Sequence, residues 1–112
     1  PVHQNWKRAI VEAEDTSTVF LNQFSRPALR ALRTEKTTRL ERDLVPGYQG
    51  PSVMAEFGHA KDLYFGGDME ASIALSGQVA GRIDRVKPVK QIIDETVAEF
   101  RETVSRLGRQ YA

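Results

Sequence analysis

Residues 6–21 read WKRAIVEAEDTSTVFL and join a helical pattern to a strand-like run. Apolar side chains recur from Trp6 to Ala13 at helical spacing and form one face. After a polar break, residues 18–21 (TVFL) are β-branched and aromatic, which is typical of a buried strand. One helix followed by one strand predicts the α/β class, here as a mostly helical fragment of an α/β repeat.

The composition limits the class of protein. The 112 residues suffice for one modest domain, and sixteen Lys and Arg against fifteen Asp and Glu leave a formal charge of +1. Such a balanced charge argues against bulk nucleic-acid binding. The absence of Cys excludes disulfides and thiolate metal sites and fits a cytoplasmic location. The apolar runs are far too short to cross a bilayer, so we expect no membrane association.

Downstream of the strand, residues 26–33 read RPALRALR and predict a helix opened by its proline, continuing weakly to Leu44. The three arginines fall on one side of this helix, where they could bind an anion. Acidic residues follow closely between positions 35 and 43 and offset the positive field. We therefore expect a face that is solvated or paired within the chain.

Residues 45–67 form the least regular part of the sequence. Seven Gly and Pro residues in this stretch disfavour long regular elements and predict loops with short extended pieces. Aromatic residues recur through it, so we expect it to pack over something as a cap or lid. We interpret His59 as an ordinary loop histidine, with a proton shuttle or a ligand contact as the alternative.

Residues 68–83 predict another helix, with Asp68 as N-cap and Glu70 in the first turn, where the helix dipole favours it. Ala74, Ala80 and two glycines share one stripe of this helix. Each glycine inside a helix costs about 1 kcal/mol relative to alanine, so we expect a packing or binding reason for them. Tight packing on a sheet is the favoured reason, and close approach of a flat ligand is the alternative.

The clearest helix of the sequence starts at Pro88, which suits a first helical turn. Its apolar residues recur at steps of three and four and form a face that we call the seam. The seam consists of Val89, Ile93, Val97, Phe100, Val104, Leu107 and Tyr111. Lys90 with Asp94, and Glu102 with Arg106, are expected to form ion pairs. We expect the seam to lie on its own domain; pairing with a partner helix, and hence a homodimer, is the alternative.

No complete active site can be assigned from the residues themselves. His3 and His59 are far apart and lack a second ligand at helical spacing, so no metal site is expected. Residues 77–81 (GQVAG) match neither the dinucleotide fingerprint nor the P-loop. No serine lies in a nucleophile elbow and the carboxylates are scattered, so no catalytic residue is proposed.

Several stretches, taken together, nevertheless point to a family. The C-terminal half resembles the end of the nitronate monooxygenases, formerly 2-nitropropane dioxygenases, at YFGGDME (64–70), SGQVAGRI (76–83) and KPVKQII (87–93). Residues 1–3 with 6–10, and 18–20 with 25–33, are similar to the segment that follows the family's last phosphate-binding turn. Relatives often carry Gly before the Arg of residues 26–33, and Asn at the position of Thr34. The resemblance covers nearly the whole chain, and SGQVAG followed by KP is its most specific part.

The resemblance implies a parent enzyme with a TIM-barrel FMN domain and a smaller cap-like domain, which oxidises alkyl nitronates with O₂ through the flavin. Such a barrel takes about 250 residues, and the family's catalytic histidine and main phosphate loops lie upstream of anything matched here. We therefore interpret the chain as the C-terminal part of such an enzyme, with the missing barrel portion as its partner. Residues 1–44 would derive from the barrel, 45–67 would be the cap or lid, and 68–112 the closing helices.

In this frame Ser76, Gly77 and Gln78 are the candidate cofactor-binding residues, close to the flavin or the nitronate substrate. Tyr64 and Phe65, together with His59, are weaker candidates for the cap side of the pocket.

Two rival interpretations stay open. A relative with the same architecture could instead be an NAD(P)H:quinone reductase or a flavin-dependent enoyl reductase of fatty-acid synthesis. From another class, the chain could be a self-standing helical module that dimerises through the seam.

Overall fold

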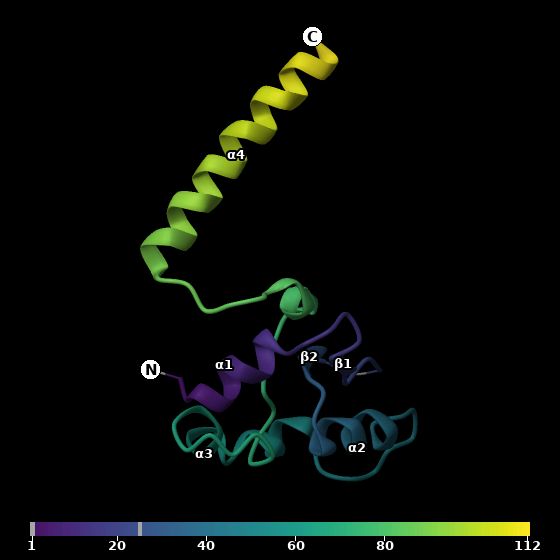
Figure 1. Cartoon of the computed structure of the whole chain (residues 1–112). Helices are drawn as coiled ribbons and strands as arrows, with labels where there is room; N and C mark the ends of the chain where they lie inside the picture. The colour runs from purple at the N-terminus through teal and green to yellow at the C-terminus, as the bar shows by residue number, and fades with distance from the viewer. Residues whose placement is uncertain (1, 25) are drawn as a thin grey trace.

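The computed structural model describes residues 2–24 and 26–112, in which helices predominate and two strands pair (Figure 1). The elements follow one another as α1 Gln4–Val11, β1 Thr18–Leu21, β2 Leu29–Leu32, α2 Glu35–Asp43, the 3₁₀ helix η1 Val53–Phe57, α3 Ala60–Tyr64, the 3₁₀ helix η2 Gln78–Arg82, and α4 Val89–Tyr111. The expected first helix, first strand and last helix are therefore confirmed.

The first strand pairs with a second strand that the sequence pattern did not reveal. β1 and β2 form an antiparallel hairpin in which Thr18 faces Leu32. The predicted helix over residues 26–33 is therefore wrong. Pro27 lies in the connection between the strands rather than in a first helical turn. Pairing with β1 provides hydrogen-bond partners for the backbone of β2. It also buries the apolar side chains at the C-terminal end of β2.

Helix α2 begins only after Thr34, so the weak helical pattern expected through Leu44 starts later than predicted. The Thr34 side chain accepts a hydrogen bond from the Thr37 N–H, and the Thr37 side chain accepts one from the Thr34 N–H. This reciprocal capping box satisfies two of the donors that a helix leaves unpaired at its N-terminus. The inner face of α2 packs on β1 through Leu40 and Leu44.

Two buried clusters hold the hairpin and the short helices together. The first cluster lies between the hairpin and α2 and consists of Val19, Leu21, Ala31, Leu40, Leu44, Val53 and Ile73. The second cluster lies against α1 and α3 and consists of Trp6, Leu32, Leu63, Ala74 and Ala80. Consecutive residues of β2 enter different clusters because side chains alternate across a strand. The hairpin is therefore the centre of this body.

The Gly- and Pro-rich residues 45–67 are irregular, as predicted, but their short regular pieces are helical rather than extended. They pack on α1: the rings of Trp6 and Tyr64 stack with centroids 4.5 Å apart, and the His3 N–H donates to the Tyr64 carbonyl at 2.7 Å. The His3 side chain also caps α1 by accepting from the Asn5 N–H at 3.1 Å. This segment is therefore held to the body by contacts from α1.

Residues 68–83 do not form the predicted helix. They make turns, an extended stretch that bridges Leu75 to Ala31, and η2. The Leu32 N–H donates to the Ala74 carbonyl at 2.8 Å, so this backbone already pairs with β2. Glycines inside the stretch lower its helix propensity further. The expected stripe of small residues is therefore not a helix face.

One of the two glycines has the packing reason that was expected. A Cβ added to Gly81 would lie 2.6 Å from the Glu14 carbonyl carbon, so only glycine allows η2 to approach the chain after α1 so closely. At Gly77 the same atom would lie no closer than 3.5 Å to Val79, an ordinary contact.

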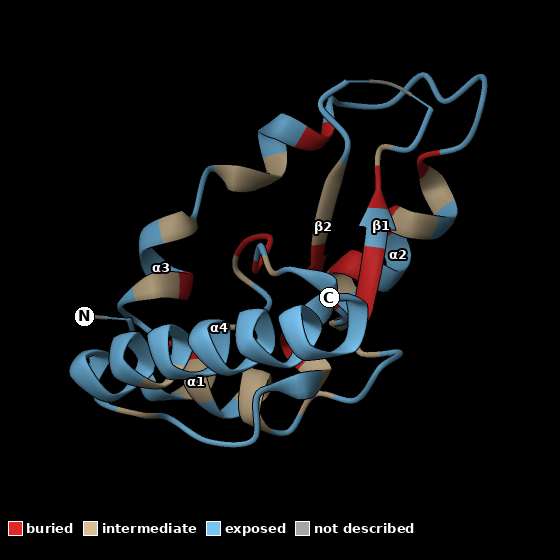
Figure 2. Ribbon diagram, turned by 90° about the horizontal axis from the view of Figure 1, so that it is seen from above, coloured by how far each residue is buried: buried red, intermediate tan, exposed pale blue. Residues whose placement is uncertain are grey.

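Helix α4 has the predicted bounds, but the prediction that its seam lies on its own domain is wrong. The helix projects away from the body (Figure 1) and is exposed along almost its whole length (Figure 2). Its apolar residues stay in solvent; Phe100 is 66% exposed. The radius of gyration is 17.8 Å, whereas a compact chain of this length would have about 13 Å. Within the described residues no helix is both long and apolar enough to span a membrane.

Candidate functional site

The three candidate cofactor-binding residues lie just beyond the point where the chain joins the hairpin. The Ser76 N–H donates to the Arg30 carbonyl at 3.1 Å, next to the bridge between Leu75 and Ala31. Ser76 is half-buried, and its hydroxyl donates to the Gly77 carbonyl at 3.4 Å. The position of Ser76 is therefore set by β2, much as a third strand would set it.

Gly77 and Gln78 are more exposed than Ser76 and lead into η2. Gln78 forms no side-chain hydrogen bond with any other described residue. Two buried residues just before this segment anchor it, because Ile73 belongs to the first cluster and Ala74 to the second. A rigid anchor followed by solvent-facing polar groups can present hydrogen-bonding groups to a ligand, but residues 76–78 alone do not enclose one.

The weaker candidates Tyr64, His59 and Phe65 lie apart from residues 76–78. Tyr64 stacks on Trp6 and is part of the contact between α3 and α1. His59 lies 3.3 Å from the Asp62 carboxylate in an exposed position. Phe65 is exposed at the end of α3. No hydrogen bond links any of them to residues 76–78 among the described part of the chain.

The arginines expected on one helix face lie instead on and around β2. The Arg30 guanidinium donates to the Thr18 hydroxyl at 3.0 Å and lies over the Phe20 ring, 5.5 Å from its centroid. Arg33 pairs with Glu41 at 3.0 Å. Two of the three arginines thus have partners within the chain, which agrees with the favoured interpretation over an anion site.

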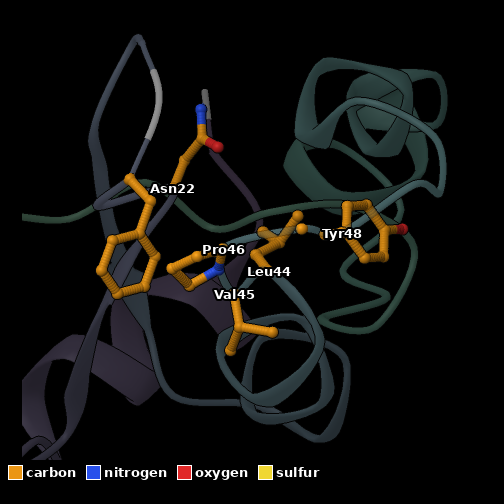
Figure 3. A pocket seen from close by; sticks show the side chains of 7 residues that line it. Asn22, Leu44, Val45, Pro46 and Tyr48 are labelled. Atoms are coloured by element: carbon orange, nitrogen blue, oxygen red, sulfur yellow. The ribbon is translucent and has the colours of Figure 1, made fainter.

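Among several shallow hollows of the described residues, the one beside Tyr48 was not suggested by the sequence pattern. It lies between the hairpin connection and the loop after α2 and has a volume of about 220 Å³. Figure 3 shows Asn22 and Pro46 on one side of the view and Tyr48 on the other. Small-molecule pockets usually enclose about 300–1,000 Å³, so this hollow is small. Its lining comes from two segments at least twenty residues apart, which no local motif could reveal.

The pKa of Glu95 is lowered mainly by a hydrogen bond from Lys87 and then by one from Gln91. This carboxylate lies on α4, away from residues 76–78 in the sequence, and it joins the helix to the segment that precedes it. Among the described residues, no group of three or more His, Asp or Glu side chains could hold a metal ion.

A flavin phosphate requires a cradle of backbone N–H groups at a helix N-terminus or a Gly-rich turn. At α2 that position is occupied by the Glu70 carboxylate, which accepts from the N–H groups of Glu35 at 3.1 Å and Lys36 at 2.7 Å. At α1 it is capped by the His3 ring. The N-termini of α1 and α2 are therefore not open to a flavin phosphate.

The chain was compared with family models, curated proteins and solved structures, and only the solved structures gave matches. Neither a family model nor a curated protein matches the chain. Among solved structures, FabK from Thermotoga maritima is 33% identical, with a TM-score of 0.80 over 100% of this chain and 35% of that chain. Its M276A mutant is also 33% identical, with a TM-score of 0.75 over 99% of this chain and 32% of that chain.

The chain spans about a third of the length of the FabK chains that it matches. At this identity the likeness extends to sequence as well as backbone. The α/β class and the fragment-like architecture expected from the sequence are consistent with this match. The assignment of residues 76–78 as cofactor contacts stays a prediction.

Proposed function

We propose that this chain forms the C-terminal part of an FMN-dependent barrel oxidoreductase. The observation that carries the proposal is the likeness to FabK over the full length of the chain, at 33% identity. FabK is an FMN-dependent enoyl reductase of the 2-nitropropane dioxygenase-like kind. The same family was indicated independently by the stretches at 64–70, 76–83 and 87–93.

In this proposal the FMN phosphate is held by residues outside the chain, where the family resemblance places the main phosphate loops. The occupied helix N-termini of α1 and α2 agree with this placement. The chain contributes the hairpin body, with Ser76, Gly77 and Gln78 facing the flavin or its substrate. Ser76 and Gln78 would donate or accept hydrogen bonds there, and Gly77 would let the ligand approach the backbone.

Two substrate classes fit such an enzyme. The likeness to FabK favours reduction of an enoyl thioester with electrons from NAD(P)H. The sequence resemblance to nitronate monooxygenases favours oxidation of an alkyl nitronate by O₂. Both substrates belong to the FMN-dependent oxidoreductase class that we propose, and an assay with each of them separates the two.

The test is a chimaera in which this chain replaces the matching third of T. maritima FabK. We expect a yellow protein that retains about one FMN per polypeptide, measured by visible absorbance after denaturation. NAD(P)H oxidation with an enoyl thioester, and O₂ consumption with a nitronate, then identify the substrate class. A folded chimaera that retains no FMN would contradict the proposal.

The role of residues 76–78 is tested in the same chimaera with Gln78→Ala, and with Gln49→Ala as a control in a loop of the body. If Gln78 faces the flavin or substrate, its replacement changes FMN affinity or KM while the control leaves both unchanged. Equal values for the two variants would show that Gln78 has no such role.

A further inference from the structure

The seam of α4 is an apolar surface that the described part of the chain leaves uncovered. All seven seam residues are exposed, from 42% at Val97 and Leu107 to 77% at Tyr111. Helices in proteins gain most of their stability from packing an apolar face against the rest of the molecule. An exposed apolar patch of this extent marks an interaction surface.

We infer that the seam docks against the apolar outer surface of the part of a FabK-like polypeptide that lies outside this chain. The inference rests on the proposed function and names the partner of α4. The match to FabK covers 100% of this chain, and therefore includes α4, but only 35% of that protein. In FabK the equivalent of α4 thus belongs to a chain nearly three times as long, with ample polypeptide to cover it.

The shape of the apolar face fits a broad surface better than a single partner helix. Ile92 and the uncharged Thr96 and Thr103 lie along one edge of the seam and widen it. A wide stripe is typical of a helix packed on a globular body, whereas a two-stranded coiled coil uses a narrow one with charges at its flanks.

The opposite side of α4 carries its charges and would face solvent. Four acidic and four basic residues lie within Val89–Tyr111, so the helix has no net charge. Helices that lie on anionic membranes carry a polar face rich in Lys and Arg. The balanced charge therefore argues against a lipid surface as the partner.

Contacts at the start of α4 set its direction, and they leave the seam exposed. Lys87 Nζ lies 2.6 Å from a Glu95 carboxylate oxygen and joins the incoming segment to the second turn of the helix. The Gln91 amide donates to the other oxygen of Glu95 at 2.6 Å. These contacts orient the start of α4 without covering its apolar side.

The test compares the 112-residue chain with the FabK chimaera by amide hydrogen exchange. We expect α4 amides to exchange at least tenfold more slowly in the chimaera, because docking suppresses local opening. Phe100→Ser should abolish that protection, and Glu99→Ser, on the charged side, should leave it intact. Phe100→Leu, which keeps an apolar side chain, should restore most of it and shows that the Ser variant does not act through misfolding.

Two results would overturn the inference. One is a chimaera whose α4 amides exchange as fast as in the isolated chain, or respond equally to Phe100→Ser and Glu99→Ser. The other is a concentration-dependent dimer of the 112-residue chain in sedimentation, with α4 protected and the dimer lost on Phe100→Ser, which would assign the seam to a second copy. Flavin content reports the proposed function separately, so loss of FMN with α4 still protected would contradict only that proposal.

Discussion

The body that ends with η2 and the helix α4 are built from the same apolar residue types, but only the body buries them. Leu21 and Leu63 are fully buried between elements that come together around the hairpin, whereas Leu107 on α4 is 42% exposed. Both regions show clear local patterns in the sequence. The two regions differ in whether another part of the chain packs against their apolar side chains. That depends on segments distant in the sequence. A helix can thus be specified locally while its partner surface is not.

The largest expected effect comes from removing a buried leucine in the body. Leu21→Ala should lower the free energy of unfolding by about 2–5 kcal/mol, because it removes contacts in the first cluster and leaves a cavity. Leu107→Ala, the matched change on α4, should stay within about 0.5 kcal/mol in the 112-residue chain. Urea denaturation followed by tryptophan fluorescence reports the body directly, since Trp6 is buried there. Equal losses for the two variants would mean that α4 is packed in solution.

Glycine substitutions sharpen the same comparison. Gly81→Ala should destabilise the body by about 1–3 kcal/mol, because the added methyl meets the Glu14 backbone and something must shift. Gly108→Ala should act in the opposite direction, since nothing lies within 4 Å of the added carbon and alanine favours the helix by up to about 1 kcal/mol.

Thermal denaturation measures the first of these changes and far-ultraviolet circular dichroism the second. A Gly81→Ala variant as stable as the parent would show that η2 does not approach the chain after α1 so closely.

The sequence correctly predicted β1 and α4, whose residue patterns each indicate one type of secondary structure. The strand at Thr18–Leu21 follows from its β-branched and aromatic run, and α4 follows from its seam and from Pro88. The prediction for residues 29–32 was wrong because the sequence LRAL suits a helix as well as a strand. Only pairing with β1 selects the strand. Tertiary pairing overrode local propensity there.

The candidate site shows the same difference between features that a local sequence pattern predicts and features that depend on distant residues. A resemblance of residues 76–83 to a family located Ser76, Gly77 and Gln78, but the expected helix was wrong because Ala74 and Ser76 hydrogen-bond to β2. The hollow beside Tyr48 was missed because its walls come from separate parts of the chain. The Glu70 carboxylate at the N-terminus of α2 was missed for the same reason, since it acts across 34 residues or more.

A smaller effect is expected at the cap of α2. Thr34→Ala removes the side chain that accepts from the Thr37 N–H and should cost about 1 kcal/mol. Thr38→Ala, one turn further and exposed, is the matched control and should be close to neutral. Chemical denaturation of the two variants checks the difference. If both behave alike, the capping box does not contribute to the stability of the body.

The smallest expected effect concerns the junction of the two regions and depends on pH. The hydrogen bond from Lys87, and then that from Gln91, lowers the pKa of Glu95 from its ordinary value of 4.5. A lowered carboxyl pKa favours the folded junction above the ordinary value, and this contribution is lost as the pH falls through the lowered value. The first turns of α4 should therefore fray as the pH falls below about 4.5.

Glu95→Gln should abolish this dependence, while Glu99→Gln, on the same charged side, should keep it. Because Glu95 is exposed, the change appears in the helical chemical shifts of residues near Lys87 rather than in the unfolding of the body. A Glu95 titration at or above the ordinary value would show that the ion pair does not form in solution. The ion pair would then not orient α4, and only the docking of the seam that we propose could do so, because no seam residue contributes to either buried cluster.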